Sequence, residues 1–174
     1  MISAYVRDAL SALGLSGCVE RVEAGGTLDD AQCEALSAAP LSAVGALADA
    51  VRVRVRRDDV RLLADGAAAA RQRPVVLTAA AETGPELMMS IALCRLSTAS
   101  GSSVGVRADA GPSVVEAALS FGADAIVMSG AAKQPLQVID EGASLAQQLE
   151  QVVRRCGRVA TWERRPRPSV EQAS

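Results

Sequence analysis

Polar side chains that could bind a ligand follow three apolar segments predicted to be β-strands. The candidates are Thr78, Glu82, Arg107, Asp109, Ser129 and Lys133. If these strands run parallel, their carboxyl ends meet at one edge of a sheet, which is where α/β folds bind small molecules. The loop from Ser129 to Lys133 could in addition hold an anion through its backbone amides. Ordinary solvation of strand ends remains the alternative interpretation of the same residues.

The residue types present argue against the common catalytic and metal sites. The chain contains no histidine, which removes the commonest general base and the commonest metal ligand. Its four cysteines, Cys18, Cys33, Cys94 and Cys156, are widely scattered and form no C-x-x-C pair. This spacing does not support a zinc or iron–sulfur site. We therefore expect no metal, no cofactor and no catalytic residue, and we interpret Cys94 and Cys156 as small apolar side chains of a core.

Two consecutive strand–helix–strand units span residues 73–130 and would position the candidate residues. Their strands are predicted at 74–80, 103–108 and 123–128, and their helices at 83–96 and 112–121. Each helix has a start signal, because Thr83-x-x-Glu86 and Ser113-x-x-Glu116 have capping-box spacing and a proline stands in each first turn. Gly122 stands where the second helix should end. This alternation of strand and helix predicts a parallel sheet with crossover helices.

The remaining segments divide the chain into three parts. Residues 1–57 should form an N-terminal helical segment, with helices at 1–15, 27–40 (Thr27 as N-cap) and 41–55, and a connector at 18–26. Residues 58–162 should form a parallel α/β core, which adds a strand at 59–64, a helix at 143–156 and a strand at 158–162. Residues 163–174 are expected to be a disordered tail. The predicted fold class is α/β, either a partial (β/α) barrel or a small parallel sheet with flanking helices.

Charge and hydropathy bound the partners of the chain. A net charge of −2 over 174 residues favours binding neither to nucleic acid nor to a membrane surface. No apolar run approaches the ~20 residues of a membrane span, and the N-terminus lacks a signal-peptide pattern, so we expect a cytoplasmic protein. Arginines alternate with valines from Arg52 to Arg57. We favour a helix end whose arginine stems cover the core over a basic binding patch.

Several stretches resemble radical S-adenosylmethionine enzymes of the biotin-synthase type. The resemblance is strongest to the branch that makes menaquinone precursors from futalosine and to the deazaflavin-cofactor synthases. LDDAQCEALSAAPLSAVGALADAVRVRV, within residues 27–57, resembles the N-terminal helices of that family. TGPELMMSIALCRL, ALSFGADAIVMSG and VVRRCGRVATWERRP resemble its later helices, a late strand and its C-terminal segment. The resemblance implies a fold derived from a (β/α) barrel.

The same resemblance reveals a missing motif. In that family a C-x-x-x-C-x-x-C loop follows the first strand and binds an iron–sulfur cluster, to which S-adenosylmethionine attaches. Here no cysteine stands between Cys33 and Cys94, and family members are much longer. We therefore expect a non-catalytic relative that acts as partner or regulator of an enzyme, with menaquinone synthesis as the implied pathway.

The shortened barrel also bears on oligomeric state. Because it would expose sheet edges, we expect a homo-oligomer or a hetero-complex with a related full-length enzyme. A small-molecule or anion-binding module, or a minor enzyme, that uses the strand-end residues is the alternative. Cluster ligands supplied by another chain or by the scattered cysteines are a third possibility.

Overall fold

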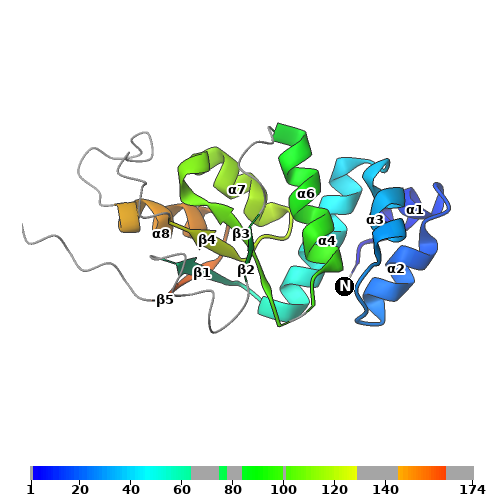
Figure 1. Cartoon of the computed structure of the whole chain (residues 1–174), viewed down its shortest axis with the longest axis horizontal. Helices are drawn as coiled ribbons and strands as arrows, with labels where there is room; N and C mark the ends of the chain where they lie inside the picture. The colour runs from blue at the N-terminus through cyan, green and yellow to red at the C-terminus, as the bar shows by residue number, and fades with distance from the viewer. Residues whose placement is uncertain (1, 64–74, 78–83, 100, 129–144, 164–174) are drawn as a thin grey trace, which may run out of the picture.

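The chain folds into a parallel β-sheet at one end and a group of helices at the other (Figure 1). The computed structural model describes residues 2–63, 75–77, 84–99, 101–128 and 145–163. The strands are β1 Asp59–Leu63, β2 Val75–Leu77, β3 Ser103–Arg107, β4 Ala125–Val127 and β5 Val159–Glu163. The helices are α1 Ala4–Ser11, α2 Ser16–Glu23, α3 Asp30–Ser37, α4 Leu41–Arg56, α6 Gly84–Ser97, α7 Pro112–Ser120 and α8 Leu145–Arg155, and a 3-10 helix, η1, spans Ala108–Ala110. The predicted α/β class is confirmed.

The strands pair in the order β2-β3-β4-β1-β5, and every pair is parallel. Strand β1 therefore lies between β4 and β5 and not beside β2, which follows it in the sequence. Its central residue Leu62 stands opposite Ile126 of β4 on one side and opposite Trp162 of β5 on the other. The parallel sheet with crossover helices was predicted correctly, whereas the strand order could not be obtained from the sequence.

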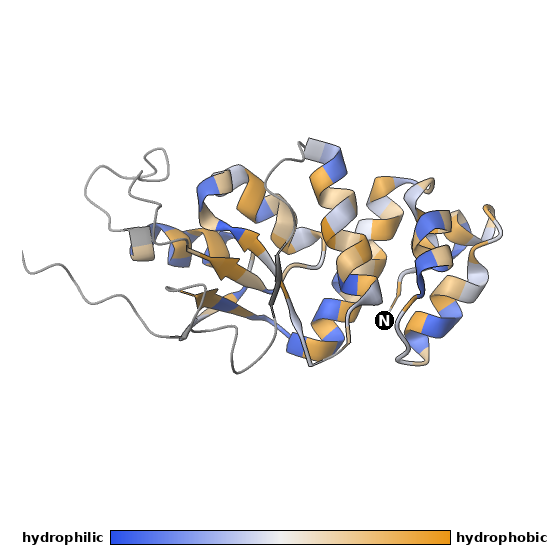
Figure 2. Cartoon of the chain, in the orientation of Figure 1, coloured by the Kyte–Doolittle hydropathy of each residue, from blue (hydrophilic) through white to orange (hydrophobic). Residues whose placement is uncertain are grey.

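One face of the sheet carries the main hydrophobic core. Side chains at alternate strand positions, such as Val60, Val106 and Ile126, pack in one cluster with residues of α6, α7 and α8. The intervening positions Leu63 and Val127 point to the other face, as the two-residue period of a strand requires, and form a separate small cluster with Ala125. Most of the length of the strand arrows is coloured as hydrophobic in Figure 2. All three described crossover helices thus cover the same face.

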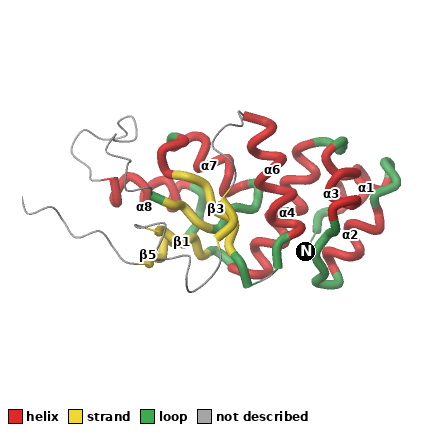
Figure 3. Tube along the Cα trace, viewed as in Figure 1, coloured by secondary structure: helices red, strands yellow, loops and turns green. Residues whose placement is uncertain are grey.

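The N-terminal helices form a second core, which α6 shares. Leu36 of α3 and Leu47 of α4 are fully buried there, and Figure 3 shows these helices grouped beyond α6, away from the strands. Helix α6 places Ile91 against the sheet and Leu96 against the N-terminal helices. Because it is buried on two sides, α6 is apolar nearly all round. No helix in the described ranges is long and apolar enough to cross a membrane.

Two local predictions in the N-terminal segment were wrong. Residues 18–26, predicted to be a connector, contain most of α2, whose Val19 and Val22 are buried. The flanking glycines concealed this short apolar stripe. Helix α3 is capped by Asp29 and not by Thr27, because the Asp29 carboxylate accepts from the Gln32 amide at 2.9 Å and the Gln32 side chain accepts from the Asp29 amide at 3.2 Å. This reciprocal pair is a capping box.

Turn residues fix where α7 begins and ends. Gly111 (φ 95°) is its N-cap, and no side chain caps it, so Ser113 does not act as the cap that its spacing predicted. Gly122 (φ 100°) follows the helix as predicted, and a Cβ there would lie 3.1 Å from the Cβ of Ala48. Gly122 is therefore required both by its left-handed conformation and by the close approach of α4.

Candidate binding site at the carboxyl edge of the sheet

The strand order places a topological switch point between β1 and β4. These neighbours pair directly, with Leu63 opposite Val127 at their carboxyl ends. From β1 the chain goes on to β2 at one edge of the sheet, and from β4 it goes on to β5 at the other edge. Neighbouring strands whose connections leave in opposite directions open a crevice at their carboxyl ends, which is where open α/β sheets bind ligands. The fold thus favours this edge as a binding site.

Of the six candidate residues, the structure describes two. Thr78, Glu82, Ser129 and Lys133 lie outside the described residues. Arg107 ends β3 and Asp109 lies in η1, so both stand at the predicted carboxyl edge. The structure also brings them together, because Arg107 Nε donates to Asp109 Oδ1 at 2.9 Å and Nη2 donates to the second carboxylate oxygen.

Arg107 and Asp109 neutralise one another. Both side chains are 40% exposed. The hydrogen bond from Arg107 lowers the pKa of Asp109, and the same bond raises the pKa of Arg107. Each group is therefore held more firmly in its charged form. The bidentate pair offers a fixed planar surface at the end of β3 but little net charge, so it does not by itself attract an anion.

A buried charge cluster, which sequence reasoning missed, lies at the opposite, amino edge of the sheet. Asp124, directly before β4, is fully buried, and its Oδ1 accepts from Arg95 Nη2 at 2.6 Å and from the Val104 amide at 2.7 Å. Its Oδ2 accepts from Arg56 Nε at 2.9 Å. Arg95 is fully buried as well and also donates to the Gly122 carbonyl at 3.0 Å. Burial lowers the pKa of Arg95, and Asp124 opposes that shift.

The arginine-rich end of α4 supplies further bonds near this edge. Arg52 Nε and Arg158 Nη2 both donate to Asp49 Oδ1, at 2.8 and 2.9 Å. Arg54 Nη1 donates to the Val22 carbonyl at 2.6 Å. Arg52 is buried, whereas Arg54 is exposed. Together with the bond from Arg158, their bonds tie α4 to α2 and to the start of β5. Because ligands of parallel α/β folds bind at the carboxyl edge, we assign the bonds of Arg52 and Arg158 to Asp49 to stability and not to binding.

The signal for the buried cluster was present in the sequence but ambiguous. Arg95 and Asp124 are single charged residues within the apolar stretches of α6 and of residues 118–128. A lone charge in an apolar run is buried only with a partner. Their partners, however, are distant in sequence, since Arg95 is 29 positions from Asp124 and Arg56 is 68 positions from it.

Metal binding and thiol chemistry find no support among the described residues. No group of three or more Cys, Asp or Glu side chains in those ranges could hold a metal ion. All four cysteines are free thiols; Cys18 is buried, whereas Cys94 and Cys156, predicted to be buried, are partly buried. Burial raises the pKa of each thiol. Thiolate, the form that attacks substrates and binds metals, is therefore disfavoured at neutral pH.

Two cavities lie in the helical segment, away from the strand ends. One of about 390 Å³ lies between the start of the chain, α2 and α4, and the other, of about 300 Å³, lies between the α1–α2 turn and α3.

In comparisons with known proteins, no family model, curated protein or solved structure matches this chain. What the site can do therefore follows from its own residues: a switch point between β1 and β4 and, at the neighbouring end of β3, the neutral pair of Arg107 and Asp109.

Proposed function

We propose that this chain is a non-catalytic protein derived from a (β/α) barrel and that it acts as partner or regulator of a larger enzyme. The observation that carries the proposal is the strand order together with the helices on one face. In a barrel, consecutive strands are neighbours, the helices share the outer face, and the last strand closes against the first. Strands β2, β3 and β4 are consecutive neighbours, and β4 lies against β1.

This order is what remains when barrel units are removed between the first and second described strands. The last barrel strand then still adjoins the first. From β2 to β3 and from β3 to β4 the chain advances across the sheet in the same direction. Right-handed crossovers that advance in one direction place their helices on one face of the sheet, and α6 and α7 are found on one face. Strand β5 occupies the side of β1 where the next barrel strand would stand. The barrel origin agrees with the resemblance to radical S-adenosylmethionine enzymes.

The proposed loss of catalysis rests on the residues. The chain has no histidine and no three-cysteine motif, so neither the cluster nor a histidine base of its own is available for the family's chemistry. By the same resemblance we propose menaquinone synthesis as the pathway and the cytoplasm as the location. Anaerobic reconstitution of the purified chain with iron and sulfide tests the proposed loss of the cluster. We expect neither to be retained, and stoichiometric cluster binding would contradict it.

The outer edge of β5 is the proposed docking surface for the partner. The Val159 amide donates toward β1, to the Asp58 carbonyl at 2.9 Å, so the backbone groups of Ala160 and Trp162 point away from β1 by strand alternation. No strand in the described ranges pairs with that side, and Val159 is 59% exposed. An edge of this kind is a ready template for another strand, and a full-length enzyme of the resembled family is the proposed occupant.

Native mass spectrometry of the tagged chain, purified gently from its own cells, tests the partnership. We expect a hetero-complex with a full-length enzyme. The exposed edge residue Val159→Lys should abolish the complex, because lysine on an edge opposes strand pairing. The matched control is Leu13→Lys, which changes a 52% exposed leucine far from the sheet and should leave the complex intact. A stable monomer in the wild type, or equal loss in both variants, would contradict the proposal.

A binding module is the second candidate, and the switch point between β1 and β4 favours it. In this alternative, a small molecule or anion occupies the carboxyl edge beside Arg107 and Asp109. A thermal-shift screen with nucleotides and phosphorylated metabolites tests it. A shift that Arg107→Gln removes would support the module, and no shift with any compound would exclude it for those classes.

A further inference from the structure

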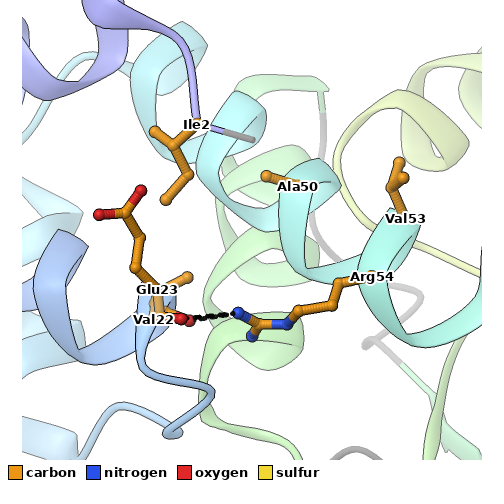
Figure 4. A pocket seen from close by; sticks show the side chains of 6 residues that line it. All are labelled: Ile2, Val22, Glu23, Ala50, Val53 and Arg54. Carbon is orange, nitrogen blue, oxygen red and sulfur yellow. Dashed lines mark hydrogen bonds between the residues drawn. The ribbon is translucent and has the colours of Figure 1, made fainter.

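The larger cavity in the helical segment combines an apolar wall with two charged side chains (Figure 4). Its volume of about 390 Å³ lies within the range of pockets that hold small organic ligands. Four apolar residues line it, together with one residue that carries a carboxylate and one that carries a guanidinium. The lining residues are Ile2, Val22, Glu23, Ala50, Val53 and Arg54.

Arg54 is held in place by one part of its guanidinium. Its Nη1 donates to the Val22 carbonyl at 2.6 Å and lies 3.5 Å from the Glu23 carbonyl, so it caps the carboxyl end of α2. Figure 4 shows the side chain extending from α4 across the cavity to reach Val22. Among the described residues, Nε and Nη2 have no partner. These two nitrogens form the planar fork that binds both oxygens of a carboxylate.

The carboxylate in the lining does not oppose an anion strongly. Both oxygens of Glu23 accept from Arg7, with Nη1 at 2.7 Å from Oε2 and Nη2 bonded to Oε1. The three charged groups therefore sum to one positive charge, which belongs to Arg54. A fixed fork needs little reordering on binding, and this improves the affinity for a carboxylate of matching geometry.

We propose that this cavity binds a small carboxylate that carries an apolar chain or ring. The carboxylate occupies the fork of Arg54, and the apolar part lies against Ile2, Val22 and Ala50. The site belongs to the helical segment and is independent of the sheet edge where a protein partner is proposed. Failure of one proposal therefore leaves the other standing.

Titration of the full chain with 3-phenylpropionate, followed by NMR at the amides and methyl groups of Ile2, Val22 and Ala50, tests the site. The neutral analogue 3-phenylpropan-1-ol is the matched ligand control. Because a hydrogen bond to a charged group is stronger than a neutral one, the carboxylate should bind about tenfold more tightly than the alcohol. No saturable shift at these residues, or equal affinity for the two ligands, would overturn the proposal.

Two variants separate the charge from the cavity. Arg54→Gln should remove the preference for the carboxylate, and Arg54→Lys should restore only part of it, because lysine lacks the fork. Ala50→Leu should weaken both ligands by filling the cavity while leaving Arg54 intact, and its melting temperature shows whether the fold is kept. Arg154→Gln, which changes an exposed arginine of α8 away from this cavity, should change nothing. A preference that survives Arg54→Gln would assign the binding to another place.

Discussion

Replacing Asp124 with alanine should destabilise the protein more than any surface charge change. The substitution removes the only carboxylate that contacts the fully buried guanidinium of Arg95 in the described residues, and it also deprives the Val104 amide of its acceptor. Breaking a buried ion pair by removing one partner costs about 3–5 kcal/mol. For a chain of this size that corresponds to a fall in melting temperature of roughly 6–20 °C. Domains have a total stability of only about 5–15 kcal/mol.

Urea unfolding followed by circular dichroism measures the effect. The control is Arg7→Gln, which breaks a pair whose side chains are 45% and 33% exposed and should cost less than about 1 kcal/mol. A double-mutant cycle with Arg95→Met isolates the coupling. The double variant should be more stable than the sum of the single losses predicts, because no unpaired buried charge remains on either side.

The outcome that refutes this reasoning is equally definite. If Asp124→Ala costs no more than Arg7→Gln, or if the coupling between Arg95 and Asp124 is below about 0.5 kcal/mol, the buried cluster is not what ties α6 to the sheet. Arg56→Gln gives an independent comparison. It removes the second, 14% exposed arginine while leaving the Arg95 pair, and it should cost less than Asp124→Ala.

Three further predictions address packing, thiols and pH. Gly45→Ala would place a Cβ 2.4 Å from the Phe121 ring and should lower the free energy of unfolding by about 1–3 kcal/mol. The control Gly17→Ala, whose Cβ would have no atom within 4 Å, should be neutral or slightly stabilising. Urea unfolding measures both, and equal effects would contradict the prediction. Because burial raises the pKa of all four thiols, iodoacetamide should alkylate them roughly tenfold faster in urea than in the native protein, and equal rates would refute it. Pairing with Arg107 lowers the pKa of Asp109, so the stability that this pair contributes is present above pH 3.8, the ordinary pKa, and is lost as the pH falls through the lowered pKa. In Arg107→Gln, carbon NMR should show that the pKa of Asp109 rises. An unchanged titration of Asp109 would refute the pairing.

The sequence predicted most elements of the fold because local patterns report local burial. The helix at 41–55 appears as α4, Leu41–Arg56, and the strand at 158–162 appears as β5, Val159–Glu163. Apolar residues at helical or alternating spacing mark the face that must leave water, whatever covers it. Prediction failed for α2, where only a short stripe was available between glycines, and at Asp29, where two adjacent acidic residues and a threonine competed for the cap.

The candidate site could be predicted only in outline. That polar residues follow parallel strands is a consequence of the class of fold, and Arg107 and Asp109 do stand at the carboxyl edge. Their mutual pairing is a matter of side-chain geometry that spacing does not reveal. The cavity beside Arg54 is formed by the start of the chain, α2 and α4, so no single stretch of sequence contains it.

By itself, the sequence determined where most of the helices and strands form, that the sheet is parallel, and which common catalytic residue types are missing. Only the tertiary structure decided that β1 lies beside β4, that the crossover helices share one face, and that Asp124 joins Arg56 and Arg95. The physical reason is range. Periodicity and caps act over a few residues. Strand order and buried ion pairs depend on contacts between distant segments, and the same local patterns are compatible with many such arrangements.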